Sequence, residues 1–247
     1  MSATLRSRLG ARVALRPTPR GTRDLTVAPW VAYAERVLQV TPTIGTRAQQ
    51  GEDTRRKILH LAMNLASKQG LETLTIGDLA KELGMSKSGL FAHFGSKEEL
   101  QIATIGAAAA VFVEHIVTPA MAAKPGMARL QELLEGHLRY MESSVFEGGC
   151  FFSAVTAEFD DKPGRVRDKI VEMMKRWANL LATEVEAAQA SGEIDPGVEA
   201  LQVVFELNAA TSHANATARL MGDPRAYAHA RAAIRTRLAS VSTAPRT

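Results

Sequence analysis

The chain has 247 residues, of which 46% are hydrophobic and 23% are charged, and its mean hydropathy is −0.07. This composition can supply a buried core, and the absence of an uninterrupted run of about 18 apolar residues predicts no membrane-spanning helix. The net charge of +4 is uneven, because residues 1–50 carry +6 and the remainder carries −2, so the basic isoelectric point alone does not indicate a nucleic-acid-binding domain.

The residue types favour an all-α protein. Aromatic residues make up 5% of the chain, alanine is frequent, and runs of alternating β-branched residues are absent. The single cysteine, Cys150, excludes an intramolecular disulfide and fits a reducing, cytoplasmic location. We favour a buried, unreactive Cys150 over a redox-active one, since free cysteines are commonly core residues.

Residues 1–50 contain four prolines and eight arginines and show little periodicity, with room for a short helix over 30–40. No apolar stretch typical of a secretory signal is present. We expect a disordered basic extension; the alternative is an arm that contacts DNA phosphates or the minor groove.

Three short helices are predicted next. A helix over about 53–69 ends at Gly70, and a second begins after Thr75, whose hydroxyl can cap the first turn. Gly84 ends the second helix, and Ser86 begins a third with Leu90, Phe91 and Phe94 facing inward. Two short helices joined by a tight glycine turn are typical of a helix-turn-helix, whose second helix enters the DNA major groove.

Gly95 ends the third helix, and Ser96 with Glu99 forms a capping box that opens a longer one. From Thr54 to Leu100 this pattern resembles the DNA-binding domain of the TetR family of bacterial transcriptional regulators. The segment 75–100, TIGDLAKELGMSKSGLFAHFGSKEEL, fits the family pattern around the recognition helix position by position. The resemblance implies an N-terminal three-helix domain joined to a larger helical regulatory and dimerisation domain.

The resemblance also implies the DNA contacts. Thr75 and Lys97 are expected at phosphates, and Lys87 at a guanine edge or a phosphate. The family often has tyrosine at position 91, where its hydroxyl binds phosphate; here Phe91 lacks that hydroxyl and is expected in the core. The predicted DNA-binding residues are Arg55, Thr75, Ser86, Lys87, Ser88, Gly89, His93 and Lys97.

Six further helices are predicted from apolar periodicity. The first runs from Lys97 to Thr118 and is expected to stop at Pro119. The others cover about 126–144, 150–159, 164–190, 198–221 and 224–240, and all of them are expected to pack into one bundle. We therefore divide the chain into a basic extension (1–50), a helix-turn-helix domain (51–98) and a ligand-binding and dimerisation domain (99–242).

Methionine and aromatic side chains in this bundle can form an adaptable apolar pocket, although most such residues at helical spacing are simply core. The lack of a charged cluster predicts an apolar or weakly polar effector. The candidate ligand-binding residues are Phe112, His137, Met141, Cys150, Phe151, Phe152, Phe159, Met173 and Trp177.

The last two helices are the candidate dimer interface, because the segment 208–218, NAATSHANATA, is dominated by small residues that allow close helix approach. A helix-turn-helix that reads a palindrome needs a two-fold partner, which favours a homodimer over packing within one chain. The candidate interface residues are Leu201, Val204, Phe205, Asn208, Ser212, Tyr227, Ile234 and Leu238.

The sequence gives little support to catalysis, cofactor binding or a metal site. It lacks a G-x-S-x-G motif, a phosphate loop and a dinucleotide fingerprint, and its six histidines never lie three or four residues apart. We therefore predict a cytoplasmic homodimeric repressor that binds double-stranded DNA at a palindromic operator, does not bind membranes, and is released by a small-molecule effector. The alternative is an effector-binding bundle or a thiol-based oxidant sensor that acts through Cys150.

Overall fold

The computed structural model describes residues 46–143 and 145–243, and this part of the chain consists of helices joined by turns and loops, with no β-strand beyond one isolated bridge between Ile194 and Ser242. The all-α prediction is therefore confirmed. The expected extension lies largely outside the described residues. The helices are α3 (Thr46–Gln69), α4 (Ile76–Glu82), α5 (Lys87–Phe94), α6 (Lys97–Phe112), the π-helix η1 (Val113–Val117), α7 (Thr118–Ala120), α8 (Met127–Glu142), α9 (Phe151–Glu158), α10 (Arg165–Ala190), α11 (Ala200–Met221) and α12 (Arg225–Val241).

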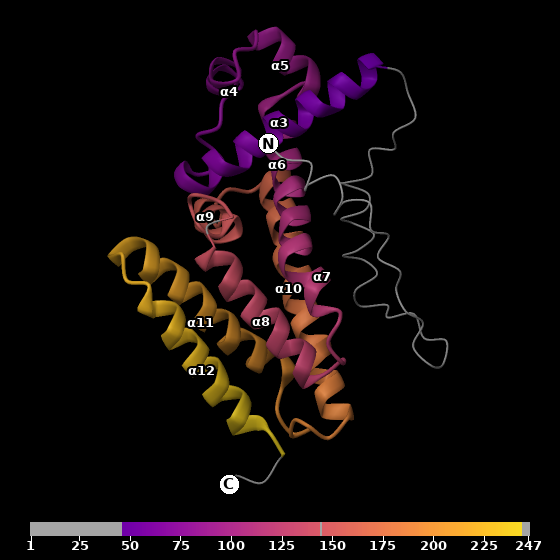
Figure 1. The fold of residues 1–247 in the computed structure, drawn as a ribbon, viewed down its shortest axis with the longest axis vertical. Helices are drawn as coiled ribbons and strands as arrows, with labels where there is room; N and C mark the ends of the chain where they lie inside the picture. Colours follow the sequence, from indigo (N-terminus) through magenta and orange to yellow (C-terminus); the bar gives the residue numbers. More distant parts are fainter. Residues whose placement is uncertain (1–45, 144, 244–247) are drawn as a thin grey trace.

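Helices α3, α4 and α5 gather at one end of the molecule, and α6 runs from them into the bundle formed with α8, α10, α11 and α12 (Figure 1). Helix α3 begins at Thr46 rather than near residue 53, so residues 46–50 are helical and do not belong to the expected disordered extension. The division of the chain at residue 98 stays a prediction, since α6 packs against both α3 and α10.

The helix ends of the N-terminal unit follow the predicted capping chemistry. The Thr75 hydroxyl accepts a hydrogen bond from the Asp78 amide at 3.0 Å, and the Ser86 hydroxyl accepts one from the Gly89 amide at 3.0 Å. Gly84 adopts a φ of +63°, which lets the chain reverse between α4 and α5 and lets the Met85 amide donate to the Ala80 carbonyl at 2.8 Å.

Pro119 does not stop the helix that begins at Lys97, contrary to the prediction. The chain widens into the π-helical turn of η1 and continues through α7, which carries Pro119 in its first turn. A proline removes an N–H group and its ring collides with the carbonyl four residues earlier, and a widened turn is one way to accommodate both. The helix consequently continues to Ala120, one residue beyond Pro119.

The segment Lys97–Ala120 is long and apolar enough to cross a membrane, with a mean hydropathy of 1.7 over its most apolar window. Two thirds of that window is buried inside the protein, and buried core helices meet the same criterion. Its apolar character is thus explained by packing against α3, α8 and α10.

Helix α12 is held to α8 by a charge cluster. The Arg231 guanidinium donates to Glu135 at 2.9 Å and to Glu142 at 2.6 Å and 2.8 Å. The Arg231 contact, mainly by hydrogen bonding, lowers the pKa of the Glu142 carboxyl. This cluster fixes the outer helix pair α11–α12 against the rest of the bundle.

Candidate nucleic-acid interface and ligand cavity

The N-terminal end of α5 is open to solvent. Ser86, Lys87 and Ser88 are exposed, whereas Leu90 and Phe94 on the opposite side are buried in the core. A helix of this length with one buried side and a polar leading end can present that end to a DNA groove. The hydrogen bond that the Ser86 hydroxyl accepts is within the cap, so that lone pair serves the helix itself.

Lys87 lies alongside α4 rather than extending freely into solvent. A Cβ atom added to Gly77 would lie 3.3 Å from the Lys87 Cε atom, 3.6 Å from its Nζ atom and 3.6 Å from the Thr75 hydroxyl. Thr75 and Lys87 therefore converge at Gly77. The Thr75 hydroxyl donates to the Asp78 carboxylate at 2.6 Å, so the Lys87 ammonium is the group of this pair that suits a phosphate contact.

Two of the predicted basic DNA-binding side chains, Arg55 and Lys97, bond to backbone carbonyls of the protein. Arg55 donates to the His93 carbonyl at 2.6 Å, and its guanidinium lies 4.3 Å from the centre of the Phe94 ring. Lys97 donates to the Glu72 carbonyl. These contacts fasten the end of α5 and the start of α6 to their neighbours, and DNA contacts by Arg55, His93 and Lys97 stay predictions.

The prediction that Phe91 is a core residue is wrong, because 52% of its surface is exposed on α5. The helical spacing that buries Leu90 and Phe94 turns Phe91 towards solvent, so the three aromatic and aliphatic residues do not share a face. An exposed phenyl ring on the recognition helix is available for apolar contact with thymine methyl groups or sugars.

Phe91→Tyr should raise DNA affinity by a few-fold, because a hydroxyl at an exposed site can donate to a phosphate with a net gain of about 1 kcal/mol. The salt dependence should not change, since no cation is added. Phe91→Ala should lower the affinity and leave thermal stability nearly unchanged. Fluorescence anisotropy at several salt concentrations measures both effects. Phe94→Ala is the control, and it should lose about 3–5 kcal/mol of stability instead; equal destabilisation by both alanine variants would contradict the assignment.

The N-terminal unit is clamped to the segment that leads into α9. Glu147 accepts from Asn64 at 2.7 Å and pairs with Lys68 at 2.7 Å, while the Gly148 amide donates to the Ser67 hydroxyl at 3.0 Å. The name α3 clamp is used below for these contacts of Glu147 and Gly148 together with those of Glu158, all of which are made to residues on or just after α3. The clamp joins the DNA-binding end of the molecule to the bundle.

The other half of the α3 clamp is the Glu158 carboxylate at the end of α9. It accepts from the backbone amides of Leu71 at 2.6 Å and Glu72 at 2.9 Å, directly after α3 ends. The fit is close, since a Cβ atom on Gly70 would lie 2.6 Å from a Glu158 oxygen. Sequence periodicity gives no sign of these contacts, because the partners lie about eighty or more residues apart.

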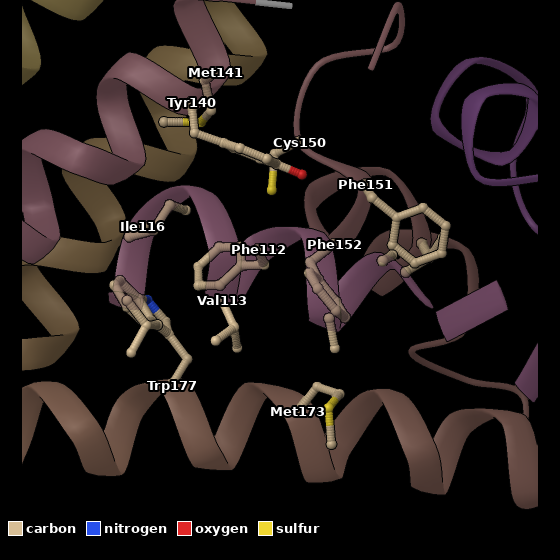
Figure 2. Packing of buried hydrophobic residues seen from close by; sticks show 14 of the residues in the cluster. Phe112, Val113, Ile116, Tyr140, Met141, Cys150, Phe151, Phe152, Met173 and Trp177 are labelled. Carbon is tan, nitrogen blue, oxygen red and sulfur yellow. The ribbon is translucent and has the colours of Figure 1, made fainter. Parts of the chain in front are cut away.

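A cavity of about 370 Å³ lies among α6, α8, α9, α10 and α11. Its apolar side is formed by rings and thioethers that lie towards one another, including Phe112, Phe152, Met173 and Trp177 (Figure 2). The Phe112 and Trp177 rings meet edge to face with centroids 5.1 Å apart. The volume is within the range of small-molecule sites, roughly 300–1,000 Å³.

Six of the nine candidate ligand-binding residues line this cavity: Phe112, His137, Cys150, Phe152, Met173 and Trp177. The other three do not. Met141, Phe151 and Phe159 are buried in the surrounding core, and Figure 2 shows Phe151 lying apart from Trp177 on the other side of its helix. Adjacent residues of a helix point about 100° apart, so Phe151 and Phe152 cannot face the same space.

The polar groups at the centre of the cavity wall are neutral. Burial lowers the pKa of His137 to about 4 and raises the pKa of the Cys150 thiol. The Cys150 Sγ atom lies 3.8 Å from His137 Nε2, and neither group carries charge at physiological pH. A buried, protonated thiol reacts slowly with oxidants, since the thiolate is the reactive form, and this does not favour the oxidant-sensor alternative.

One face of α11 is apolar and open to solvent. Leu201, Phe205 and Leu220 are 55%, 68% and 86% exposed, and the exposed residues between them recur every three or four positions. Among the candidate dimer residues, Leu201, Phe205 and Ser212 are exposed on α11, whereas Asn208 is half-buried and accepts from the Trp177 indole N–H at 2.9 Å.

The remaining candidate dimer residues need correction. Val204, Tyr227 and Leu238 are buried within the protomer, and Ile234 is 6% exposed at the floor of a hollow between α11 and α12. Helices α11 and α12 pack against each other within one chain. These side chains are therefore buried inside the protomer and are not available to a partner. An interface here would consist of the exposed α11 face and the small exposed residues of α12.

Two family models match the chain, one over the N-terminal helices and one over the bundle. Residues 58–104 match the model of bacterial regulatory proteins of the tetR family, and residues 126–234 match the tetracyclin repressor-like C-terminal domain. The chain belongs to the TetR family. It is therefore a DNA-binding transcriptional regulator, and the resemblance inferred from residues 54–100 is confirmed.

Known TetR proteins agree with this in sequence and in fold. The chain is 35% identical over 52 residues to the HTH-type transcriptional regulator AcrR of Shigella flexneri, a match over 21% of this chain and 24% of that protein. A TetR regulator from Chloroflexus aurantiacus is 25% identical, with a TM-score of 0.73, over 78% of this chain and 98% of its own.

More distant structures share the TetR fold alone. A TetR regulator from Cytophaga hutchinsonii is 20% identical with a TM-score of 0.68, over 79% of this chain and 98% of its own. A transcriptional regulator from Saccharomonospora viridis, solved in complex with choline, is 21% identical with a TM-score of 0.63, over 77% of this chain and 98% of its own.

Sequence reasoning missed the part of this TetR cavity that α11 supplies. Asn208, Ser212, Asn215 and Arg219 line it and lie three or four residues apart, on one side of the helix. We interpreted the segment as a stripe of small residues for dimerisation. The signal that could have found the site was the polar stripe within it, since four polar side chains on one helical face indicate a common neighbour.

Proposed function

We propose that the protein is a homodimeric repressor, and that a small molecule bound in the cavity releases it from a palindromic operator. The observation that carries the proposal is that one segment serves both sites. Gly148, Cys150, Phe152, Ser153 and Thr156 line the cavity, and the same stretch, through Glu147, Gly148 and Glu158, forms the α3 clamp.

This arrangement supplies a route for two-site coupling. A ligand that fits one position of residues 147–158 better than another stabilises the corresponding position of α3, and α3 carries α4 and α5 with it. In a dimer, the two recognition helices would then change their separation. The exposed α11 face supports the dimer, because a two-fold axis there would bury Leu201 and Phe205 of both copies.

The test begins with DNA fragments that the purified protein selects from a random pool. A two-fold symmetric sequence with half-sites about 34–36 Å apart supports a dimeric reader. An in vitro transcription template carrying that site should then give less transcript when the protein is added. No enrichment of any sequence would refute the proposed function.

Lys87→Ala provides the residue-level test. It should weaken operator binding by about 1–3 kcal/mol with lost discrimination at one position if Lys87 reads a base. It should weaken binding uniformly, with the salt slope lower by about one, if it contacts phosphate. The control is Lys124→Ala, which removes the same charge from the exposed loop between α7 and α8 and should not alter DNA binding. An unchanged affinity in Lys87→Ala would refute both roles.

A further inference from the structure

The cavity wall is largely apolar and includes one cationic side chain. Phe112, Phe152 and Trp177 supply the apolar side, with Phe112 and Phe152 ring centroids 6.0 Å apart. Arg219, an exposed residue of α11, also lines the cavity, and no aspartate or glutamate lines it anywhere in residues 46–143 and 145–243. A ligand that contacts both regions meets one positive charge and no negative charge.

The Arg219 guanidinium has no carboxylate to neutralise it. Within the part of the chain that the structure describes, no ion pair or hydrogen bond of Arg219 is formed, while Arg231, one helix further on, takes both Glu135 and Glu142. Glu142 and Arg219 both influence the pKa of the Tyr227 hydroxyl, but the Glu142 carboxylate is already bound by Arg231. A planar guanidinium that is left with its donors free matches a carboxylate in a two-point contact.

A second polar group stands beside Arg219. The Asn215 Oδ1 atom is buried and has no hydrogen-bond partner, although a buried acceptor in this position normally has one. Asn215 and Arg219 lie one turn apart and meet over Gly149, where an added Cβ atom would be 2.9 Å from Asn215 Oδ1 and 3.1 Å from Arg219 Cδ. Because Gly149 has no side chain, Asn215 Oδ1 and the Arg219 side chain can both lie this close to its backbone.

We propose that the cavity binds a monoanion with an apolar, preferably aromatic, body, whose carboxylate pairs with Arg219 and whose hydroxyl or N–H group donates to Asn215. This inference rests on the proposed effector site and names its ligand class. It departs from the expectation of an uncharged effector. It also separates this chain from the Saccharomonospora viridis protein, whose ligand choline is a cation.

The test compares matched acids and esters by isothermal titration calorimetry on the full chain. The probes are mandelic acid, which carries a hydroxyl beside its carboxylate, 2-naphthoic acid and decanoic acid, which carry none, the methyl ester of each acid, and choline. At least one acid should bind more tightly than its ester by about tenfold, and choline should not bind. An ester that binds as well as its acid, binding of choline alone, or no binding by any of the probes at millimolar concentration would overturn the ligand class.

The variant Arg219→Gln should remove the difference between acid and ester and leave the ester affinity unchanged. Arg235→Gln, which removes an exposed arginine from α12, is the matched control and should keep the difference. A preference for the acid that survives in Arg219→Gln would overturn the role of that residue. Binding to the selected operator without ligand is measured in parallel. A protein that binds operator but ignores the acids refutes only the ligand class, whereas one that selects no DNA refutes the proposed function.

Discussion

Phe205→Glu should convert the proposed dimer into a folded monomer and abolish high-affinity operator binding. Phe205 is 68% exposed in the protomer, so a carboxylate there is tolerated by the single chain. In the proposed dimer the two-fold axis would bury it twice, at a cost of several kcal/mol for each unpaired charge. A monomer keeps one recognition helix and loses the second half-site.

Light scattering at micromolar concentration measures the mass, and a gel-shift titration measures operator affinity. Asn179→Glu, which adds the same charge to an exposed position on α10, should change neither. Ile234→Glu is not an equivalent test, because Ile234 is 6% exposed and its replacement would disturb the protomer itself. A wild-type mass near the 26.6 kDa of one chain would refute the dimer and the palindromic operator with it.

Gly148→Ala should separate the cavity from the DNA-binding end. The added Cβ atom would lie 1.8 Å from the Ser67 carbonyl oxygen and 2.0 Å from its carbon, and backbone atoms cannot turn aside. The segment before α9 must therefore withdraw from α3, which breaks the Gly148–Ser67 hydrogen bond and strains the contacts of Glu147. We expect a loss of about 1–3 kcal/mol of stability or more, and operator affinities that no longer differ between ligand-free and ligand-bound protein.

Thermal unfolding measures the first effect, and operator titration with and without an effector measures the second. The matched control is Gly51→Ala in α3, where nothing lies within 4 Å of the added Cβ atom. Because alanine is favoured over glycine inside a helix, the control should gain about 0.5–1 kcal/mol. Wild-type stability and an intact effector response in Gly148→Ala would show that the α3 clamp does not carry the signal.

The sequence predicted best the features that depend on a few neighbouring residues. Thr75, Ser86 and Gly84 fix the ends of α4 and α5 through hydrogen bonds over three to five positions, and the structure places those ends as predicted. Pro119 shows the limit of local rules, because the π-helical turn before it lets the helix continue. Phe91 shows another, since an apolar residue on a short helix can face either side.

Long-range features could not be predicted, because they depend on which helices meet. The α3 clamp joins residues such as Ser67 and Gly148, and no periodicity connects them. The cavity was half predicted: its aromatic side was recognised by residue type, while Asn215 and Arg219 were hidden in a segment that reads equally well as a dimer stripe. Burial also separated Leu238 from Phe205, which the sequence placed together on one interface.

The hydrogen bond from Arg55 to the His93 carbonyl restricts how α5 can move relative to α3. It ties the last turn of α5 to α3 at 2.6 Å, and Gln101 of α6 donates to the Leu71 carbonyl at 3.0 Å, so the recognition helix cannot rotate independently of its neighbours. The unit must tilt or translate as one body. In the proposed mechanism, an effector therefore alters the distance between the two half-sites that the dimer binds, but not the base sequence that each α5 prefers. Changes in that sequence preference would require substitutions at the N-terminal end of α5.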